Sequence, residues 1–292
     1  GFRNAVDIAI NREGELFTYD SDLEFDVGTP WYRPTRVNHV TSASEFGWRP
    51  GSAKWPEYFA DSNGAVINMG PGSPTGISFG HHSNFPAPYQ DKLFICDWTF
   101  GSIYLIDMEE DGSSYVGTKT EFLNGQPLNI SAMRFGPDGH MYFLVGGRNT
   151  DSRLYRIKYV GPSQKGAGKR LVANQDLRDL RHSLEVFHGN PHAGNQAITM
   201  AWPHLSHPDR NVRYAARLAI ENQPVSLWQE RVLREEDQRA LIHASIALCR
   251  HGDPSLSHRI LKKLNQIPFD SLAAEDQLAL LRAYSLCFIR LG

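Results

Sequence analysis

The densest group of polar side chains lies near the start of the chain, on both sides of a short apolar stretch. Arg3 and Asn4 precede that stretch, and a polar run from Tyr19 to Asp26 follows it. Three carboxylates in this run carry the hard oxygen atoms that Ca²⁺ takes from a single loop: Asp20, Asp22 and Asp26. The run lacks the glycine and the final glutamate of an EF-hand. The pattern therefore predicts either a calcium site or a series of turns in which aspartates bond their own backbone.

The composition excludes several other kinds of site and partner. The net charge is −2 and the basic residues are scattered, so nucleic acid is not expected as a partner. No apolar stretch reaches the roughly 18 residues of a transmembrane helix. Three widely spaced cysteines are too few for a disulfide framework or a zinc site, and no Cys-x-x-Cys-His motif is present to attach haem c. We expect all three cysteines to be small buried apolar residues.

The elements that position the polar run repeat along the first half of the chain. Residues 8–17 align with residues 133–142: in each, an alternating strand meets a polar turn that contains Gly, and a second strand returns. A looser copy spans residues 76–95, and further strands are expected at 102–106 and 153–157. Repeated antiparallel sheets of this size are typical of a β-propeller. About three blades are present, and three blades cannot close a ring, so we expect the others upstream of Gly1.

The second half has the spacing of helices. Apolar residues recur three and four positions apart in three segments, with the following members: Val212, Ala215, Ala216, Ala219; Leu241, Ala244, Leu248; Leu256, Ile260, Leu261, Leu264. Two helical starts, at Pro208 and Asp253, are about 45 residues apart, which matches HEAT or armadillo repeats. An ordinary helical bundle is the alternative. On the first helical segment we expect the arginines to face solvent or the next repeat: Arg210, Arg213, Arg217.

The two halves are predicted to be separate domains. The segment 161–172 is rich in Gly and basic residues and poor in apolar ones, as in a linker. The predicted organisation is a partial propeller over 1–160, a linker over 161–172 and HEAT-like helical repeats over 173–292. The fold class is thus β followed by α.

Several of these motifs, in this order, resemble those of a known family. They are Gly1-Phe2-Arg3-Asn4, the Glu13-Gly14 hairpin, the Asp20 loop, Phe46-Gly47-Trp48-Arg49, Ser73-Pro74-Thr75-Gly76 and the hairpin of residues 135–142. The family is that of the soluble quinoprotein sugar dehydrogenases and sorbosone-dehydrogenase-like propellers. The segments Asp20 to Arg36 and Phe94 to Trp98 look still more like large planctomycete-type membrane-bound dehydrogenases, which join such a propeller to HEAT-like repeats and a c-type haem domain.

The resemblance implies a six-bladed propeller, of which this chain holds about three blades, and specific roles for residues in this chain. Arg3 and Asn4 match the pair that binds pyrroloquinoline quinone (PQQ), and the metal loop falls at Asp20 to Asp22. Further cofactor contacts would come from Thr75, Asp97 and Trp98, although the family has a lysine where Asp97 and Trp98 stand. The catalytic histidine lies on an earlier blade, so this chain carries no catalytic residue of its own.

Three functions are consistent with these observations. The first is part of a PQQ-dependent sugar or alcohol dehydrogenase, located outside the cytoplasm or in the periplasm, that passes electrons to a haem domain of the parent chain. The second is a non-catalytic module that binds glycan or protein. The third is a metal-dependent hydrolase of the lactonase kind, for which the Asp20 loop is the argument. Similarity of fold cannot choose among them.

Overall fold

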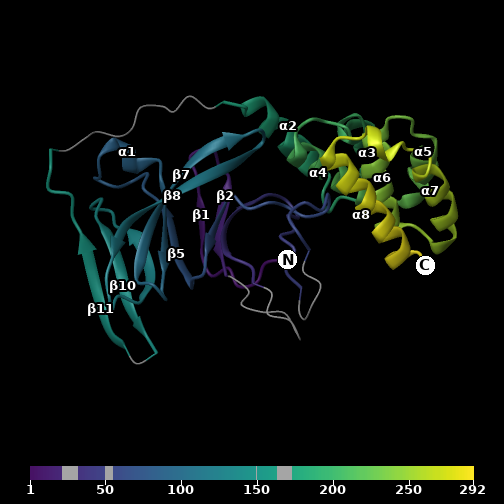
Figure 1. The fold of residues 1–292 in the computed structure, drawn as a ribbon. Helices are drawn as coiled ribbons and strands as arrows, with labels where there is room; N and C mark the ends of the chain where they lie inside the picture. The colour runs from purple at the N-terminus through teal and green to yellow at the C-terminus, as the bar shows by residue number, and fades with distance from the viewer. Residues whose placement is uncertain (22–31, 50–54, 149, 163–172) are drawn as a thin grey trace.

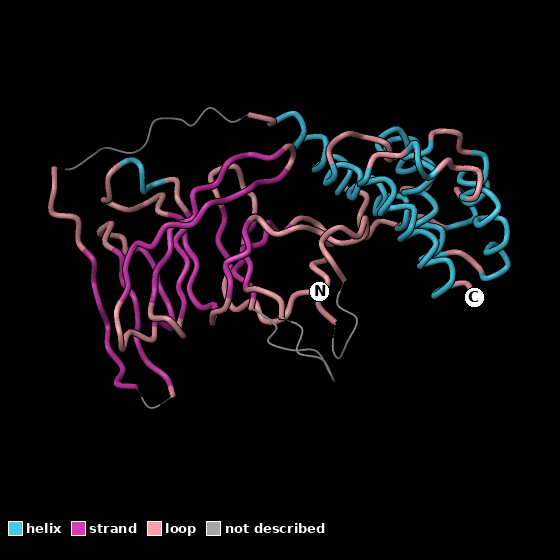
Figure 2. Tube along the Cα trace, in the orientation of Figure 1, coloured by secondary structure: helices cyan, strands magenta, loops and turns pink. Residues whose placement is uncertain are grey.

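The computed structural model describes residues 1–21, 32–49, 55–148, 150–162 and 173–292. Its strands lie between Ile8 and Ile157, and all its longer helices lie between Gln175 and Arg290 (Figures 1 and 2). Most of the predicted linker, together with Asp22 and Asp26, falls outside the described residues. None of the described helices has the length and apolar character that crossing a bilayer requires.

The strands form three antiparallel sheets, each with its strands in chain order. The first sheet contains β1 (Ile8–Ile10), β2 (Leu16–Asp20), β3 (Thr35–Val40) and β4 (Ile67–Gly70). The second contains β5 (Pro74–Phe79), β6 (Leu93–Asp97), β7 (Ser102–Asp111) and β8 (Ser114–Asn124), with the short helix α1 (Ala87–Gln90) between β5 and β6. The third has three strands, β9 (Ile130–Phe135), β10 (Met141–Gly147) and β11 (Thr150–Ile157).

The three predicted hairpins are confirmed. Their inner pairs are Ile10 with Leu16, Phe79 with Leu93 and Phe135 with Met141. Gly14 and Gly139 occupy the turns at φ of 86° and 74°, a region that glycine enters without steric cost. The local sequence therefore specifies these turns and, through them, the strand register.

The sheets pack face to face in chain order. One apolar core, which includes Phe17, Val37 and Ile95, lies between the first and second sheets. Another, which includes Phe94 and Phe143, lies between the second and third. The first strand of each sheet lies beside that of the next, because β1 contacts β5 and β5 contacts β9. The strand ends that carry the candidate site residues are consequently brought near one another.

The helices follow as α2 (Gln175–Glu185), α3 (Asn195–Ala201), α4 (Arg210–Glu221), α5 (Gln229–Arg234), α6 (Gln238–His251), α7 (Ser257–Leu264) and α8 (Ala274–Arg290). The longer helices α2, α4, α6 and α8 form a row in which each contacts the next. The shorter helices α3, α5 and α7 each pack on the helix that follows them in sequence. The result is a stack of three helix pairs, with α2 extending the row at one end.

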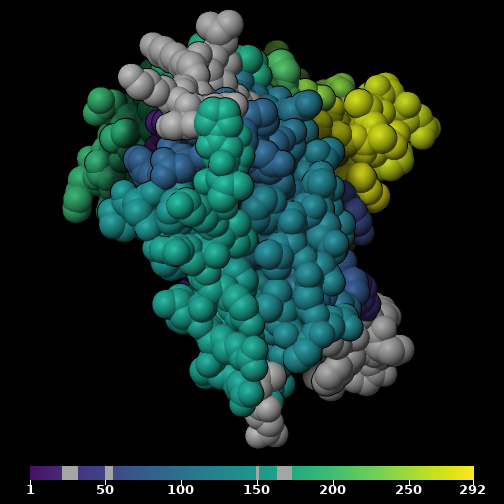
Figure 3. Space-filling view, turned by 90° about the vertical axis from the view of Figure 1, so that its left-hand side faces the viewer, coloured from purple at the N-terminus to yellow at the C-terminus, as the bar shows by residue number. Residues whose placement is uncertain are grey.

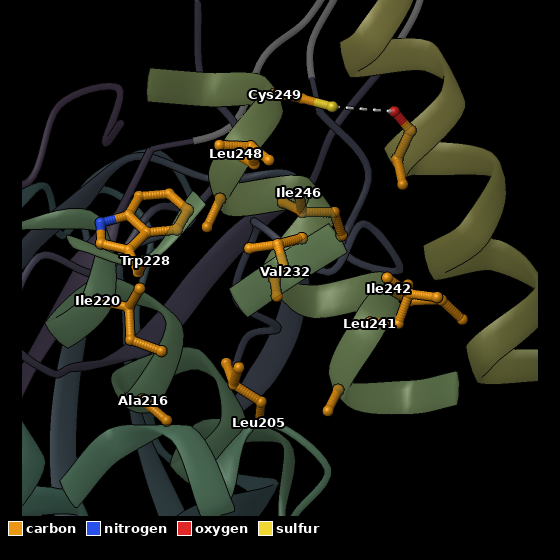
Figure 4. Packing of buried hydrophobic residues seen from close by; sticks show 14 of the residues in the cluster. Leu205, Ala216, Ile220, Trp228, Val232, Leu241, Ile242, Ile246, Leu248 and Cys249 are labelled. Carbon is orange, nitrogen blue, oxygen red and sulfur yellow. Dashed lines mark hydrogen bonds between the residues drawn. The ribbon is translucent and has the colours of Figure 1, made fainter. Parts of the chain in front are cut away.

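A continuous apolar core fills this stack (Figure 4). The predicted apolar faces of α4, α6 and α7 all contribute to it, and Trp228 and Val232 add side chains from the segment around α5. All three cysteines are buried and unpaired, as predicted, and Cys249 Sγ lies 3.8 Å from the carbonyl of Ala283 on α8. These faces were predictable because each recurs with the period of a helix.

The predicted repeat spacing is wrong. The pairs begin at Asn195, Gln229 and Ser257, so the period is much shorter than 45 residues. The two starts that gave that value belong to different positions in the stack, since α4 is the second helix of its pair and α7 is the first. Apolar periodicity identifies a helix but not its place within a pair.

The prediction that the α4 arginines face solvent or the next repeat is confirmed only for Arg213, which reaches a later helix pair, and none of the three is exposed to solvent. Arg213 and Arg217 are almost fully buried, and their partners are Glu275 on α8 and Glu221 on α4 itself. Arg210 donates to the carbonyl oxygens of Glu57, Phe59 and Ser62, which lie in the loop between β3 and β4. The first two turns of α4 thus carry cations into contacts that the helix pattern alone does not reveal.

Other polar contacts tie the helices to the sheets. The N-cap residue of α4, Asp209, accepts hydrogen bonds from the backbone and hydroxyl of Ser113, at 2.8 and 2.7 Å, in the turn between β7 and β8. Glu15, just before β2, pairs with Arg181 on α2 at 2.6 Å and with His39 on β3 at 2.8 Å. Because Glu15, Arg181 and Ser113 are buried in these contacts, the two halves of the chain are interlocked as well as covalently joined.

Glu15 makes this junction sensitive to acid. Burial alone would raise the pKa of Glu15, but the hydrogen bond from His39 and the charge of Arg181 outweigh it and lower the pKa to about 2. A depressed carboxyl pKa stabilises the folded state above the ordinary value of 4.5, and this contribution is lost as the pH falls toward 2. Burial also lowers the pKa of His39, so protonation of that ring adds to the loss.

We therefore expect Glu15→Gln to be clearly destabilised at neutral pH and to approach the wild type as the pH falls toward about 3. Urea unfolding of both proteins at a series of pH values measures the difference. Asp270→Asn, at an exposed site, is the control and should track the wild type throughout. A difference for Glu15→Gln that does not change with pH would show that its ionisation does not stabilise the junction.

Candidate functional site

Asp20, at the end of β2, is the centre of the first group of predicted site residues. Its Oδ2 accepts the backbone N–H of Arg3 at 3.0 Å, and its Oδ1 accepts those of Asn4 and Ser21 at 2.8 and 3.0 Å. The carboxylate is fully buried, and the guanidinium of Arg36 lies 3.9 Å away. Its charge and hydrogen-bonding capacity are therefore used to hold the segment that enters β1.

Arg3 and Asn4 lie beside Asp20, but their backbones rather than their side chains make the contact. The Arg3 guanidinium donates to the hydroxyl of Ser21 at 2.8 Å, and Asn4 is exposed. The structure thus gathers three of the predicted residues into one cluster in which the carboxylate tethers the chain.

Asp97 occupies the equivalent position at the end of β6. It accepts the N–H of Ser73 at 2.9 Å, before β5, and that of Phe100 at 2.8 Å, in the following turn. The hydroxyl of Tyr19 lies 3.5 Å away, which links the ends of β2 and β6. Burial raises the pKa of Asp97, and the backbone donors oppose that rise. The same device, a buried strand-end aspartate that tethers the segment entering the sheet, thus appears in two sheets.

Thr75 and Trp98 connect the second sheet to the third. The Thr75 hydroxyl donates to the carbonyl of Ile130 on β9 at 2.8 Å. The Trp98 indole N–H donates to the carbonyl of Gly146 on β10 at 2.9 Å. Both side chains satisfy backbone groups of the neighbouring sheet, a role consistent with their partly buried positions.

These contacts test whether the predicted residues can hold a cofactor or a metal. A metal would have to displace three backbone donors from Asp20, and the described part of the chain contains no group of three His, Cys, Asp or Glu placed to hold one. An anionic quinone would meet the buried carboxylate of Asp97 and would have to break the bonds of Thr75 and Trp98. The described residues therefore fit neither Ca²⁺ nor a quinone.

A further polar group at the first strands was missed in the sequence. Asp7, just before β1, accepts two hydrogen bonds from Arg134 on β9, at 2.6 and 2.7 Å, and one from the N–H of Ile77 on β5 at 3.1 Å. Although burial would raise it, the pKa of Asp7 is lowered through the bonds from Arg134 and Ile77. The sequence did contain a signal for this pair, because a charged residue lies at the first strand of two repeats: Asp7 just before β1 and Arg134 in β9. This bidentate pair ties all three sheets together at their first strands.

Comparison with known proteins gives matches among solved structures alone. Neither a protein-family model nor a curated protein matches this chain. A glucose dehydrogenase-type oxidoreductase from Thermus thermophilus matches over 53% of this chain and 45% of its own, with 19% identity and a TM-score of 0.40. The PQQ-bound aldose sugar dehydrogenase of Streptomyces coelicolor matches over 53% and 43%, with 13% identity and a TM-score of 0.41. A glucose dehydrogenase matches over 55% and 46%, with 19% identity and a TM-score of 0.44.

These structural neighbours are sugar dehydrogenases of the glucose and aldose type, one of them bound to PQQ. The match spans less than half of each of their chains. The activities and the cofactor are those of the named proteins.

The saturated carboxylate of Asp20 leads to a direct prediction. Asp20→Asn places an amide N–H₂ against backbone N–H donors, so it should cost about 1–3 kcal/mol of stability, the range for a buried group left unsatisfied. Asp151→Asn, at an exposed carboxylate, is the matched control and should have no measurable effect. The loss should be equal with excess Ca²⁺ and with a chelator, as measured by thermal unfolding. A loss that appears in the presence of Ca²⁺ alone would identify Asp20 as a metal ligand.

Proposed function

We propose that this chain supplies part of the wall of a larger propeller, buttressed by helices, in a protein that oxidises a sugar or an alcohol. The propeller part of this proposal is supported by the apolar side chains that both end sheets present on the face away from the second sheet. The oxidation of a sugar or an alcohol is inferred from the resemblance of the sequence motifs. Contiguous apolar surface of this kind is usually covered by a partner. In a propeller, each blade packs against another on both sides.

On the first sheet the outward side chains belong to β1. Ala9 points into the core between the first two sheets, whereas Ile8 and Ile10 are 59% and 57% exposed. Side chains alternate along a strand, so the two isoleucines share the opposite face. A preceding blade would cover them.

On the third sheet the same alternation appears in β10. Met141, Phe143 and Val145 face the second sheet, and Leu144 is 47% exposed on the other side, with Leu154 of β11 66% exposed. Figure 3 views the molecule from this end, where the third sheet, in green-teal, forms part of the surface. Within the described residues, the third sheet also has three strands where the others have four, so β11 is an edge to which a further strand could pair.

The contribution of this chain to a catalytic centre would be positional. The strand-end clusters around Asp20 and Asp97 hold the segments that enter β1 and β5, and Arg3 and Asn4 lie at the surface of the first cluster. The base, and any residues that bind PQQ, would come from the blades that complete the ring. The resemblance alone supports an extracytoplasmic location and a c-type haem domain in the parent chain.

We also propose that the helical half is a HEAT-like stack. Its helix pairs are thin and bury their apolar faces against neighbouring pairs, as repeats of this class do. The last helix, α8, exposes Leu281, Phe288 and Ile289, a face on which a further pair could pack.

A non-catalytic binding module is the second candidate. The observation in its favour is that Asp20, Asp97 and Trp98 are each occupied by backbone partners, which leaves the described clusters without groups for chemistry. The same saturation removes the argument for a lactonase, since Asp20 was its main support among the described residues.

Sugar-dependent reduction of a dye by the intact protein that carries this chain, with and without added PQQ, tests the proposal. Asp20→Asn weakens the tether that holds the segment entering β1, so turnover should fall together with the melting temperature. Arg3→Ala keeps the backbone bond to Asp20 and should change both little. Arg259→Ala, an exposed residue of α7, is the control and should retain full activity. Absence of dye reduction with sugars and alcohols, together with saturable glycan or protein binding, would favour the binding module instead.

A further inference from the structure

A pocket of about 340 Å³ lies between the β3–β4 loop and the ends of α6 and α8. The loop contributes Arg49 and Trp55. The two helices contribute the remaining lining residues: Arg250, His251, Arg282, Leu286, Ile289 and Arg290. Four guanidinium groups and an imidazole thus border one small space, beside two aliphatic side chains.

The guanidinium groups converge on one indole ring. The Cζ atoms of Arg49, Arg282 and Arg250 lie 3.9, 4.6 and 5.9 Å from the centre of the Trp55 ring. Stacking on the ring offsets part of the mutual repulsion of the cations. It also holds their planes in fixed positions, which lowers the entropy cost of binding a further group.

Carboxylates compensate part of this charge. Asp61 accepts from Arg282 at 2.8 and 2.9 Å and from Arg250 at 3.1 Å, Glu45 pairs with Arg49 at 2.9 Å, and Glu221 lies 3.2 Å from Arg250. Glu221 is shared with Arg217 of α4. Five arginines therefore meet three carboxylates: Arg49, Arg217, Arg250, Arg282 and Arg290 against Glu45, Asp61 and Glu221.

The C-terminal ends of α6 and α8 reduce the excess of positive charge in the pocket but do not cancel it. Arg250 and Arg290 lie in the last turns of α6 and α8, where each helix carries the equivalent of about half a negative charge. About one positive charge remains, before His251 is counted. Since the whole chain has a net charge of −2, this local excess does not follow from its composition.

Donors in the pocket remain available for a ligand. Within the described residues, Nη2 of Arg250 and Nη1 of Arg282 have no hydrogen-bonding acceptor, and Arg290 uses one nitrogen, Nη2, on the carbonyl of Arg250 at 3.2 Å. Guanidinium groups form short, strong bonds to carboxylate and phosphate oxygens. Leu286 and Ile289 offer apolar contact to the body of such a ligand.

We propose that this pocket binds a small organic oxyanion, a phosphate or carboxylate that carries an apolar group. The anionic head contacts Arg250, Arg282 and Arg290, and the apolar part lies against Leu286 and Ile289. Because the pocket is built from both halves of the chain, its ligand also strengthens the junction between them. This inference does not depend on the proposed oxidoreductase activity.

Isothermal titration of the intact protein with inorganic phosphate and with phenyl phosphate tests the anionic and apolar parts separately. We expect saturable binding of both, with phenyl phosphate the tighter. Arg290→Gln should weaken both by about tenfold, the effect of losing one charge-assisted bond. Ile289→Ser should reduce the preference for phenyl phosphate and leave phosphate binding unchanged.

Arg259→Gln, an exposed arginine of α7 paired with Glu230, is the matched control and should bind both ligands as the wild type does. Arg290 is exposed and Ile289 is 71% exposed, so both variants should melt near the wild-type temperature. The absence of saturable binding at ligand concentrations up to about 10 mM would overturn the proposal. A dissociation constant of that size corresponds to a binding free energy of about −3 kcal/mol. Equal weakening by Arg290→Gln and Arg259→Gln would overturn the proposal as well, because it would indicate non-specific attraction.

Discussion

The carboxylate of Asp61 is the contact on which the arrangement of the two halves depends most. It lies in the loop between β3 and β4, is fully buried, and accepts three hydrogen bonds from Arg282 of α8 and Arg250 of α6. Burial by itself would raise the pKa of Asp61, but Arg282 and its neighbours hold the pKa below the ordinary value. A buried charge is tolerated when every partner is in place, and removing one partner typically costs about 3–5 kcal/mol. The loop and the row of helices therefore constrain each other.

Other polar contacts extend the same constraint. Arg210 of α4 binds three carbonyls of the same loop, so three successive helices of the row contact one segment of the first sheet. Glu15 and Asp209 add ties to α2 and to the β7–β8 turn. The pocket proposed to bind an oxyanion lies in this junction. Its arginines outnumber the carboxylates that pair with them across the junction.

The sequence predicts the local elements well and their polar partners poorly. The hairpins follow from alternating residues and from Gly14 and Gly139, and the helix faces follow from apolar spacing. By contrast, Arg210 looks like a surface residue of an amphipathic helix, and its hydrogen-bond partners lie in a loop about 150 residues earlier in the chain. Asp20 and Asp97 are correctly placed at strand ends, but their donors are backbone N–H groups, whose need for a partner depends on the tertiary path of the chain. Side-chain type alone therefore suggested cofactor contacts where the structure has tethers.

The claim that the sheets and helices form one interlocked unit is tested most directly by urea unfolding of the intact protein followed with two probes. Far-ultraviolet circular dichroism follows the helices, and hydrogen exchange of the backbone amides in β2 and β6 follows the sheets. Coincident transitions in the wild type are the predicted result, with Asp61→Ala shifting both probes together to lower urea. Separate transitions in the wild type, or a shift of the helical signal alone in Asp61→Ala, would contradict it.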